Sequence, residues 1–191
     1  MVFASPLPDV EIPDVPLTEY VLAKAGALGD KPALIDGPSG RTITYAALAA
    51  GVRSLAGGLV ARGFSTGSTL ALMSPNIPEY AVIFHGVAMT GGTITTINPT
   101  YTEAEVHKQL LDSHASILVT IPMFLEVATK AAAGTEVTDV FVLGEAEGAR
   151  PVTELFGAPL AEQVPVQGDD VVVLPYSSGT TGVNKGVMLS H

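Results

Sequence analysis

The sequence predicts an α/β fold, with a mostly parallel sheet and helices on both faces. Between residues 70 and 143, short β-branched and apolar runs alternate with helical patterns, an arrangement typical of βαβ units. A further apolar run, Val171–Leu174, precedes a segment rich in glycine, serine and threonine. Because open α/β sheets bind ligands at the carboxyl ends of their strands, we expect this segment to carry the functional site.

The N-terminal residues predict an arm followed by a short helix. Residues 1–16 contain four prolines, and we expect them to form an extended arm over the surface of a domain that comprises residues 17–191. Thr18 is expected to cap a helix that runs through Leu28 and ends at Gly29.

A hairpin and a long helix are expected next. Two short apolar runs flank Gly37–Gly40, which favours a β-hairpin. Thr44 is a candidate cap for the following helix, and Gly63 is expected to end it. Its apolar residues recur at spacings of three and four and predict one buried stripe; they are Tyr45, Leu48, Val52, Leu55 and Leu59.

The alternation then defines the sheet. We expect strands at 70–73, 93–97, 117–120, 140–143 and 171–174, and helices at 79–90, 103–113 and 122–133. The helix at 79–90 has little polar surface and is expected to be buried on two sides. Residues 144–170 predict a connecting excursion with one helical turn near 152–156. Pro175 is expected to end the last strand, because proline cannot donate to a sheet ladder.

Composition narrows the class of protein. Hydrophobic residues make up 47% of the 191 residues, charged residues 15%, and mean hydropathy is +0.41. No apolar run approaches the length of about twenty residues that a membrane span needs. We therefore expect no membrane span, and we expect some apolar faces to be covered by further protein.

Net charge, cysteine content and the N-terminal residues predict which partners, chemistry and location to expect. Its net charge of −10 should repel nucleic acid and anionic membranes. There is no cysteine, which excludes disulfides and thiolate chemistry. Residues 1–16 have no basic or apolar leader pattern, so we expect a cytoplasmic location.

The glycine-rich segment has the chemistry of a polyphosphate site. Glycines allow backbone N–H groups to approach a ligand, hydroxyls add donors, and Lys185 adds a positive charge. No acidic residue lies between Val171 and His191. The segment is not a Walker A loop, because Asn184 precedes the lysine and Gly186 follows it. The alternative is a flexible surface loop with an incidental lysine.

Other candidate residues have simpler explanations. His107 and His114 are seven residues apart and allow a metal site, but two solvated histidines are favoured. His85 is expected to be a satisfied core or edge histidine. Asn98 is expected to shape a turn before Pro99.

Two acidic pairs and one serine motif complete the search. Glu103 with Glu105 fits the first turn of a helix, and Asp169 with Asp170 fits a strand entry. The one match to Gly-x-Ser-x-Gly, at Gly63–Gly67, follows an expected helix rather than a strand. It is therefore not a nucleophile elbow, and no serine-histidine-aspartate site is expected.

Residues 174–191, LPYSSGTTGVNKGVMLSH, closely resemble the phosphate-binding signature of acyl-adenylate-forming enzymes, especially the 4-coumarate–CoA ligase and acyl-CoA synthetase branch. Segments 72–80, 88–92 and 97–102 also resemble that family. Asn184 stands where the family usually has proline. The resemblance implies that the fold is the N-terminal part of an adenylate-forming domain.

The resemblance also implies a reaction. ATP activates a carboxylic acid as acyl-AMP with release of pyrophosphate, Mg2+ shields charge, and coenzyme A takes the acyl group. Backbone and hydroxyl groups of one segment would hold the β- and γ-phosphates; by resemblance they come from Ser177, Ser178, Gly179, Thr180 and Thr181. Gly182 would permit the return of the chain and Lys185 would neutralise phosphate charge.

Members of that family are more than twice as long, and the acid pocket, the Mg2+-binding glutamate and the catalytic lysine have no counterpart here. We therefore expect an N-terminal fragment that is not active alone and whose acid is unspecified. Two alternatives remain open. One is a non-catalytic interaction module or decayed pseudoenzyme, with a homo-oligomer formed through uncovered apolar faces. The other is a stand-alone nucleotide-binding regulator.

Overall fold

The computed structural model describes residues 6–8, 10–178 and 184–191. Within them, eight strands form one sheet, in the order β10-β8-β4-β3-β5-β6-β7, with β9 also paired to β8. Neighbours from β8 to β7 are parallel, whereas β9 and β10 run antiparallel to β8. The strands are β3 (Thr69–Met73), β4 (Thr93–Ile97), β5 (Ala115–Thr120), β6 (Asp139–Val142), β7 (Arg150–Pro151), β8 (Val171–Ser178), β9 (Asn184–Gly186) and β10 (Leu189–Ser190).

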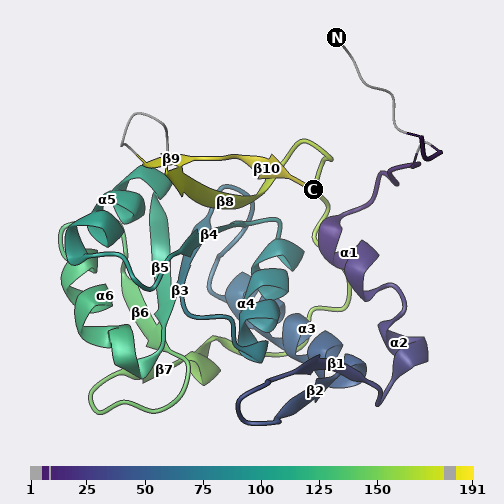
Figure 1. Cartoon of the computed structure of the whole chain (residues 1–191), viewed down its shortest axis with the longest axis horizontal. Coiled ribbons are helices and arrows are strands. Elements are labelled where there is room, and N and C mark those ends of the chain that lie inside the picture. The colour runs from purple at the N-terminus through teal and green to yellow at the C-terminus, as the bar shows by residue number, and fades with distance from the viewer. Residues whose placement is uncertain (1–5, 9, 179–183) are drawn as a thin grey trace.

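Helices cover both faces of this sheet, as the sequence predicts (Figure 1). The helices α3 (Tyr45–Ala61) and α4 (Pro78–Met89) lie on one face, and α5 (Glu103–Ser113) and α6 (Leu125–Ala132) on the other. Strand β3 shows the division, because successive side chains of a strand point to opposite faces. Leu70 and Leu72 pack with α3 and α4. Ala71 and Met73 pack with α5 and α6.

The helices that follow the two central strands, β3 and β4, lie on opposite faces of the sheet. After β3 the chain enters α4 on one face, and after the neighbouring β4 it enters α5 on the other. The carboxyl ends of β3 and β4 therefore form a topological switch point, where ligands of open α/β sheets bind. The 3-10 helix η1 (Pro122–Phe124) leads from β5 into α6.

The N-terminal elements differ from the prediction. The single expected helix is two short ones, α1 (Leu17–Leu22) and α2 (Ala25–Leu28), because Lys24 leaves the helical conformation at φ −98° and ψ 0°. Thr18 is not a cap, since α1 begins after Pro16 with no side-chain cap. Instead the Thr18 hydroxyl lies 3.0 Å from Nδ1 of His85. A buried threonine next to an imidazole uses its hydroxyl there rather than at the helix end.

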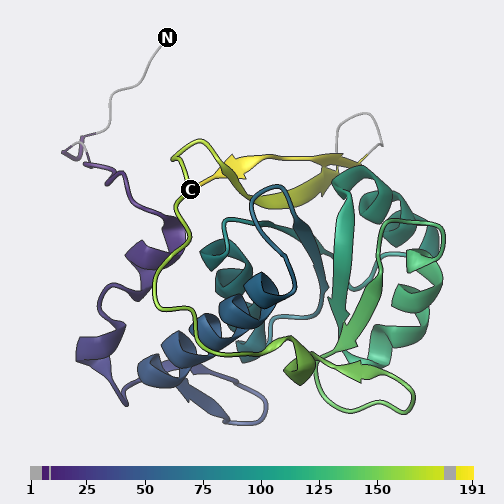
Figure 2. The ribbon, with the colours of Figure 1, turned by 180° about the vertical axis from the view of Figure 1, so that it is seen from behind.

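The arm before α1 has exposed side chains throughout residues 10–15. We expected the arm to lie over the surface, but residues 10–15, which the structure describes, lead away from the body in both views (Figures 1 and 2). Its end, at Asp14 to Pro16, borders a small hollow next to His191.

The hairpin and the long helix form as expected. Strand β1 (Pro32–Ile35) pairs antiparallel with β2 (Thr42–Thr44). Thr44 caps α3 by accepting a hydrogen bond of 3.1 Å from the Ala47 amide. The buried residues of α3 include four of the five stripe positions: Leu48, Val52, Leu55 and Leu59.

The excursion between β6 and β8 is docked rather than loose. It contains β7 and the 3-10 helix η2 (Val152–Leu155), close to the predicted helical turn. The amide of Gly157 donates to the Ser54 carbonyl and that of Leu160 to the Arg53 carbonyl, both at 2.9 Å. This segment is therefore held along α3 before the chain enters β8.

We expected Pro175 to end the last strand, but β8 continues beyond it to Ser178. The carbonyl of Pro175 accepts from the Val187 amide at 2.8 Å, so this residue faces the antiparallel side of the strand. There Val187 and Met188 interrupt the pairing between β9 and β10. The missing N–H falls at this interruption, which is where a sheet tolerates proline.

Among the residues that the structure describes, no helix is long and apolar enough to cross a bilayer.

Candidate functional site

The β8–β9 hairpin carries the predicted phosphate-binding segment. Ser177 pairs with Lys185, and Ser178 pairs with Asn184. Directly opposed residues of an antiparallel pair project from the same face, so Ser177 and Lys185 present a hydroxyl and an ammonium group side by side. Both residues are exposed. The structure thus brings together two of the predicted site residues that are eight positions apart.

Four further predicted site residues, Gly179, Thr180, Thr181 and Gly182, lie outside the described residues. Ser178 is described by its place in β8. The predicted contacts of these residues with phosphate therefore stay predictions.

Tyr176 fixes the base of this hairpin. Its hydroxyl donates to Oδ2 of Asp112 on α5, at 2.5 Å. Burial raises the pKa of Tyr176 above its ordinary value, and the hydrogen bond to the Asp112 carboxylate raises this pKa further. Opposite Tyr176, a Cβ added to Gly186 would lie 3.3 Å from the tyrosine ring, so the ring lies close against β9.

Sequence reasoning missed Asp112. It is 64 residues from Tyr176, and no motif or periodicity links the two positions. The sequence offers only an acidic residue near the end of a predicted helix, which is common on a solvated surface.

A hollow of about 290 Å3 lies beside the hairpin, at the switch point between β3 and β4. None of its lining residues is charged; they are Ser74, Asn76, Tyr80, Thr96, Ile97, Asn98, Pro99, Tyr101, Pro175 and Tyr176. Asn98 shapes the turn after β4, as expected, because its Oδ1 accepts hydrogen bonds from the Thr100 amide at 3.0 Å and the Thr100 hydroxyl at 2.9 Å. The hollow therefore offers polar but neutral groups next to the hairpin.

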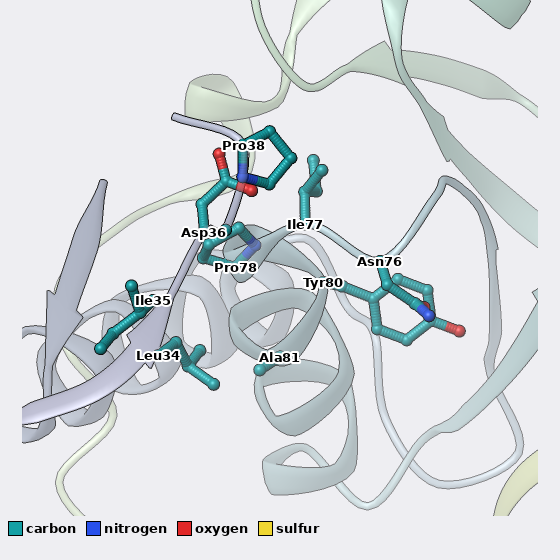
Figure 3. A pocket seen from close by; sticks show the side chains of 10 residues that line it. Leu34, Ile35, Asp36, Pro38, Asn76, Ile77, Pro78, Tyr80 and Ala81 are labelled. Carbon is teal, nitrogen blue, oxygen red and sulfur yellow. The ribbon is translucent and has the colours of Figure 1, made fainter. Parts of the chain in front are cut away.

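A second, more apolar hollow adjoins it (Figure 3). This hollow of about 360 Å3 opens between the β1–β2 hairpin and the start of α4, and Asn76 and Tyr80 line both hollows. In Figure 3, Leu34 comes from the hairpin, and Pro78 and Ala81 come from the helix on the other side. The two hollows are thus neighbours, one polar and one apolar.

A buried hydrogen-bond chain connects α5 with β4 and, through β4, with β8 of the hairpin. Gln109, which is 2% exposed, donates through Nε2 to the Thr95 hydroxyl at 2.9 Å and to the Thr96 carbonyl at 3.0 Å. The Thr95 hydroxyl in turn donates to the Leu174 carbonyl of β8 at 2.8 Å. Helix α5 is therefore fixed to β4, and β4 to β8, directly below the site.

The histidines have separate partners. Nδ1 of His107 lies 2.8 Å from the Ala131 carbonyl, and Nδ1 of His114 lies 2.6 Å from Glu136. Burial lowers the pKa of His85, which contacts Thr18. In the described part of the chain, no three His, Cys, Asp or Glu residues lie close enough together to hold a metal ion.

The acidic pairs serve local structure. Glu105 completes a capping box with Thr102 at the start of α5. Asp170 accepts a hydrogen bond of 2.7 Å from the Gln167 amide just before β8. Neither contact involves the hairpin.

Curated proteins are similar to this chain over its whole length. Among curated relatives, the chain is 42% identical over 193 residues to a 4-coumarate–CoA ligase 3 of Oryza sativa subsp. japonica, and 38% identical over 194 residues to a 4-coumarate–CoA ligase 1 of Petroselinum crispum. Both matches cover 100% of this chain but only 35% and 36% of the relatives. The chain thus spans about a third of their length.

Solved structures share the fold. A long-chain-fatty-acid-CoA ligase from Archaeoglobus fulgidus superposes with a TM-score of 0.86 at 28% identity, over 99% of this chain and 39% of that one. An anthranilate CoA ligase in complex with anthranoyl-AMP gives a TM-score of 0.86 at 22% identity, over 94% and 36% of the two chains. The model of the family described as AMP-binding enzyme matches residues 22–191. The chain therefore belongs to the AMP-binding enzyme family.

Proposed function

We propose that this chain is the N-terminal part of an ATP-dependent carboxylic acid–CoA ligase and supplies the binding site for the polyphosphate of ATP. One observation carries the proposal: the β8–β9 hairpin pairs Ser177 with Lys185, beside the predicted phosphate segment. A hydroxyl donor and an ammonium group on one face match the oxygen atoms and the negative charge of a phosphate.

The electrostatics of the hairpin support this assignment. The chain carries a net charge of −10, yet the sequence from Val171 to His191 contains no acidic residue. A polyphosphate therefore meets Lys185 without a competing carboxylate on the same hairpin. The same composition does not suit Mg2+, which prefers carboxylate ligands. We therefore propose that Mg2+ is held mainly by ATP and by residues outside this chain.

In the reaction that we propose for the whole enzyme, the acid carboxylate attacks the α-phosphorus of ATP. Acyl-AMP forms, pyrophosphate leaves, and the thiol of coenzyme A then displaces AMP. The hairpin would act by positioning the phosphates and by stabilising the charge on departing pyrophosphate. Relatives named 4-coumarate–CoA ligases favour a coumarate-like acid over a long-chain acyl acid. We propose that the chain does not turn over alone and works in the cytoplasm.

Substitution of the lysine tests the proposal. A charge-assisted contact with phosphate is worth about 1.5–3 kcal/mol, so Lys185→Ala should weaken MgATP binding about tenfold or more in isothermal titration calorimetry. Lys24→Ala is the matched control, because Lys24 is an exposed lysine next to α2. Equal affinity of wild type and Lys185→Ala would refute the nucleotide role. Acid-dependent release of pyrophosphate by the chain alone would refute its inactivity.

A second function, as a non-catalytic interaction module, is favoured by the apolar residues around β10. Val187 is 40% exposed, Met188 74% and Leu189 46%. An edge strand with apolar side chains is suited to pairing with another chain. Analytical ultracentrifugation separates the two functions: a stable oligomer that is insensitive to MgATP supports the module, and a monomer that binds MgATP contradicts it.

A further inference from the structure

We propose that Asp112, acting through Tyr176, is a positioning residue for the β8–β9 hairpin and thereby for the polyphosphate of ATP. The inference rests on the proposed function and adds to it a residue outside the phosphate-binding segment.

The first step of the argument is that Tyr176 joins three elements. It belongs to β8, its ring lies close to Gly186 of β9, and its hydroxyl donates to Asp112 of α5 at 2.5 Å. A Cβ at position 186 would lie 3.2 Å from the Leu174 side chain and 3.3 Å from the tyrosine ring, so both side chains lie close against the backbone of Gly186. The side chain of Tyr176 therefore determines how β9 lies against β8.

The second step is the register of the hairpin. The pair Tyr176–Gly186 is followed directly by the pair Ser177–Lys185. Neighbouring pairs of an antiparallel ladder move together, because each residue is joined to the next by a planar peptide bond. A shift of the tyrosine would thus displace the hydroxyl and ammonium groups that we assign to phosphate.

The third step is that Asp112 stands on a fixed support. Three residues before it on α5, the buried Gln109 is hydrogen-bonded to Thr95 and Thr96 of β4. The capping box at Thr102 stabilises the first turn of the same helix. A side chain on a helix that is fixed to the sheet can hold a contact more precisely than one on a loop.

The fourth step concerns charge. An exposed aspartate near a polyphosphate would repel it, and Asp112 is exposed. The hydrogen bond from the Tyr176 hydroxyl directs this carboxylate toward the base of the hairpin and occupies one of its oxygen atoms. Because successive residues of a strand point to opposite faces, the carboxylate anchors Tyr176 from the face opposite to that of Ser177.

Hydrogen exchange of backbone amides tests the anchor without any ligand. Tyr176→Phe and Asp112→Ala should each raise exchange at residues 185–186 about fivefold, while exchange in the central strand β3 stays unchanged. Asp112→Asn keeps an acceptor for the tyrosine and should restore most of the protection. Tyr20→Phe is the matched tyrosine control, because Tyr20 is exposed on α1. Unchanged exchange in the hairpin, or an equal rise in β3, would overturn the inference.

Titration with MgATP then tests the link to the ligand. Tyr176→Phe and Asp112→Ala should each weaken binding about fivefold, and the double variant should be no weaker than either one, because both remove the same contact. If Lys185→Ala abolishes binding but these variants leave it unchanged, the positioning role is wrong while the proposed function holds. If wild type does not bind MgATP, the proposed function fails, and so does the positioning of a ligand, whatever the exchange result.

Discussion

Gly58 on α3 is a position where a single added methyl group should disturb the segment that leads the chain to β8. A Cβ at this residue would lie 1.9 Å from the Leu155 carbonyl oxygen and 2.8 Å from the Gly157 amide nitrogen. Both neighbours are backbone atoms of the excursion that docks along α3. Because they belong to the main chain, no side-chain rotation can relieve the overlap, and the excursion must move.

The change in the free energy of unfolding caused by Gly58→Ala is the sum of opposing contributions. Alanine gains about 1 kcal/mol over glycine inside a helix. Overpacking costs about 1–3 kcal/mol. Moving the excursion also endangers the bonds of the Gly157 amide to the Ser54 carbonyl and of the Ser54 hydroxyl to the Gly157 carbonyl, both 2.9 Å, each worth about 1 kcal/mol. We expect Gly58→Ala to lower the free energy of unfolding by about 1–3 kcal/mol.

Urea denaturation followed by circular dichroism measures this change. The matched control is Gly26→Ala in α2, where an added Cβ would meet nothing within 4 Å. The control should be neutral or more stable by up to about 1 kcal/mol. If Gly58→Ala were as stable as wild type, the excursion would not be packed on α3 as described, and the reasoning would be refuted.

Three further predictions concern the core, a cap and pH. Leu118→Ala, at a fully buried position of β5, should cost about 2–5 kcal/mol in urea denaturation, whereas Leu111→Ala, at a position 44% exposed, should cost far less. Thr102→Ala removes the cap of α5 and should cost about 1 kcal/mol, with helix loss visible in thermal melts. Burial lowers the pKa of His85, so its contribution to stability is present above about pH 6.5 and is lost as the pH falls below that value. Between pH 7 and 5, wild type should lose stability more steeply than His85→Gln; parallel slopes would contradict the assignment.

Elements whose signals are local could be predicted from the sequence. Strand β4 has the bounds expected from its β-branched run, and α5 has the expected bounds Glu103 to Ser113. The alternation of such elements also predicts the parallel sheet and its two helical layers, because the connection of parallel strands requires helices on the faces.

The errors arose where tertiary contacts overrode a local rule. Thr18 has the residue type of a cap, but its buried hydroxyl lies against His85. Pro175 has the residue type of a strand end, but its missing donor falls at a break in the neighbouring strands. In both cases the residue's partner is distant in sequence, and periodicity carries no information about it.

The docking of residues 144–170 along α3 could not be predicted from the sequence either. Residues 144–170 show no periodicity because they are held by backbone hydrogen bonds to α3 and by two buried side chains, Val152 and Leu155, rather than by a repeating apolar face. Gly57 and Gly58 on α3 leave space for the backbone of this segment. From the sequence alone, glycines inside a helix indicate only a lower helix stability. Their role becomes visible once the backbone of residues 155–160 is placed against them.

For helix α5, some contacts could be predicted from the sequence and others could not. Its start depends on Thr102 and Glu105, three residues apart. Its middle depends on Gln109, whose partner Thr95 is 14 positions away, and its end carries Asp112, whose partner is 64 positions away. The bounds of the helix follow from the local contacts, whereas its connection to the β8–β9 hairpin depends on the distant ones. The residues of the proposed phosphate site thus lie in one contiguous segment, but the contacts that support the hairpin join residues far apart in the sequence.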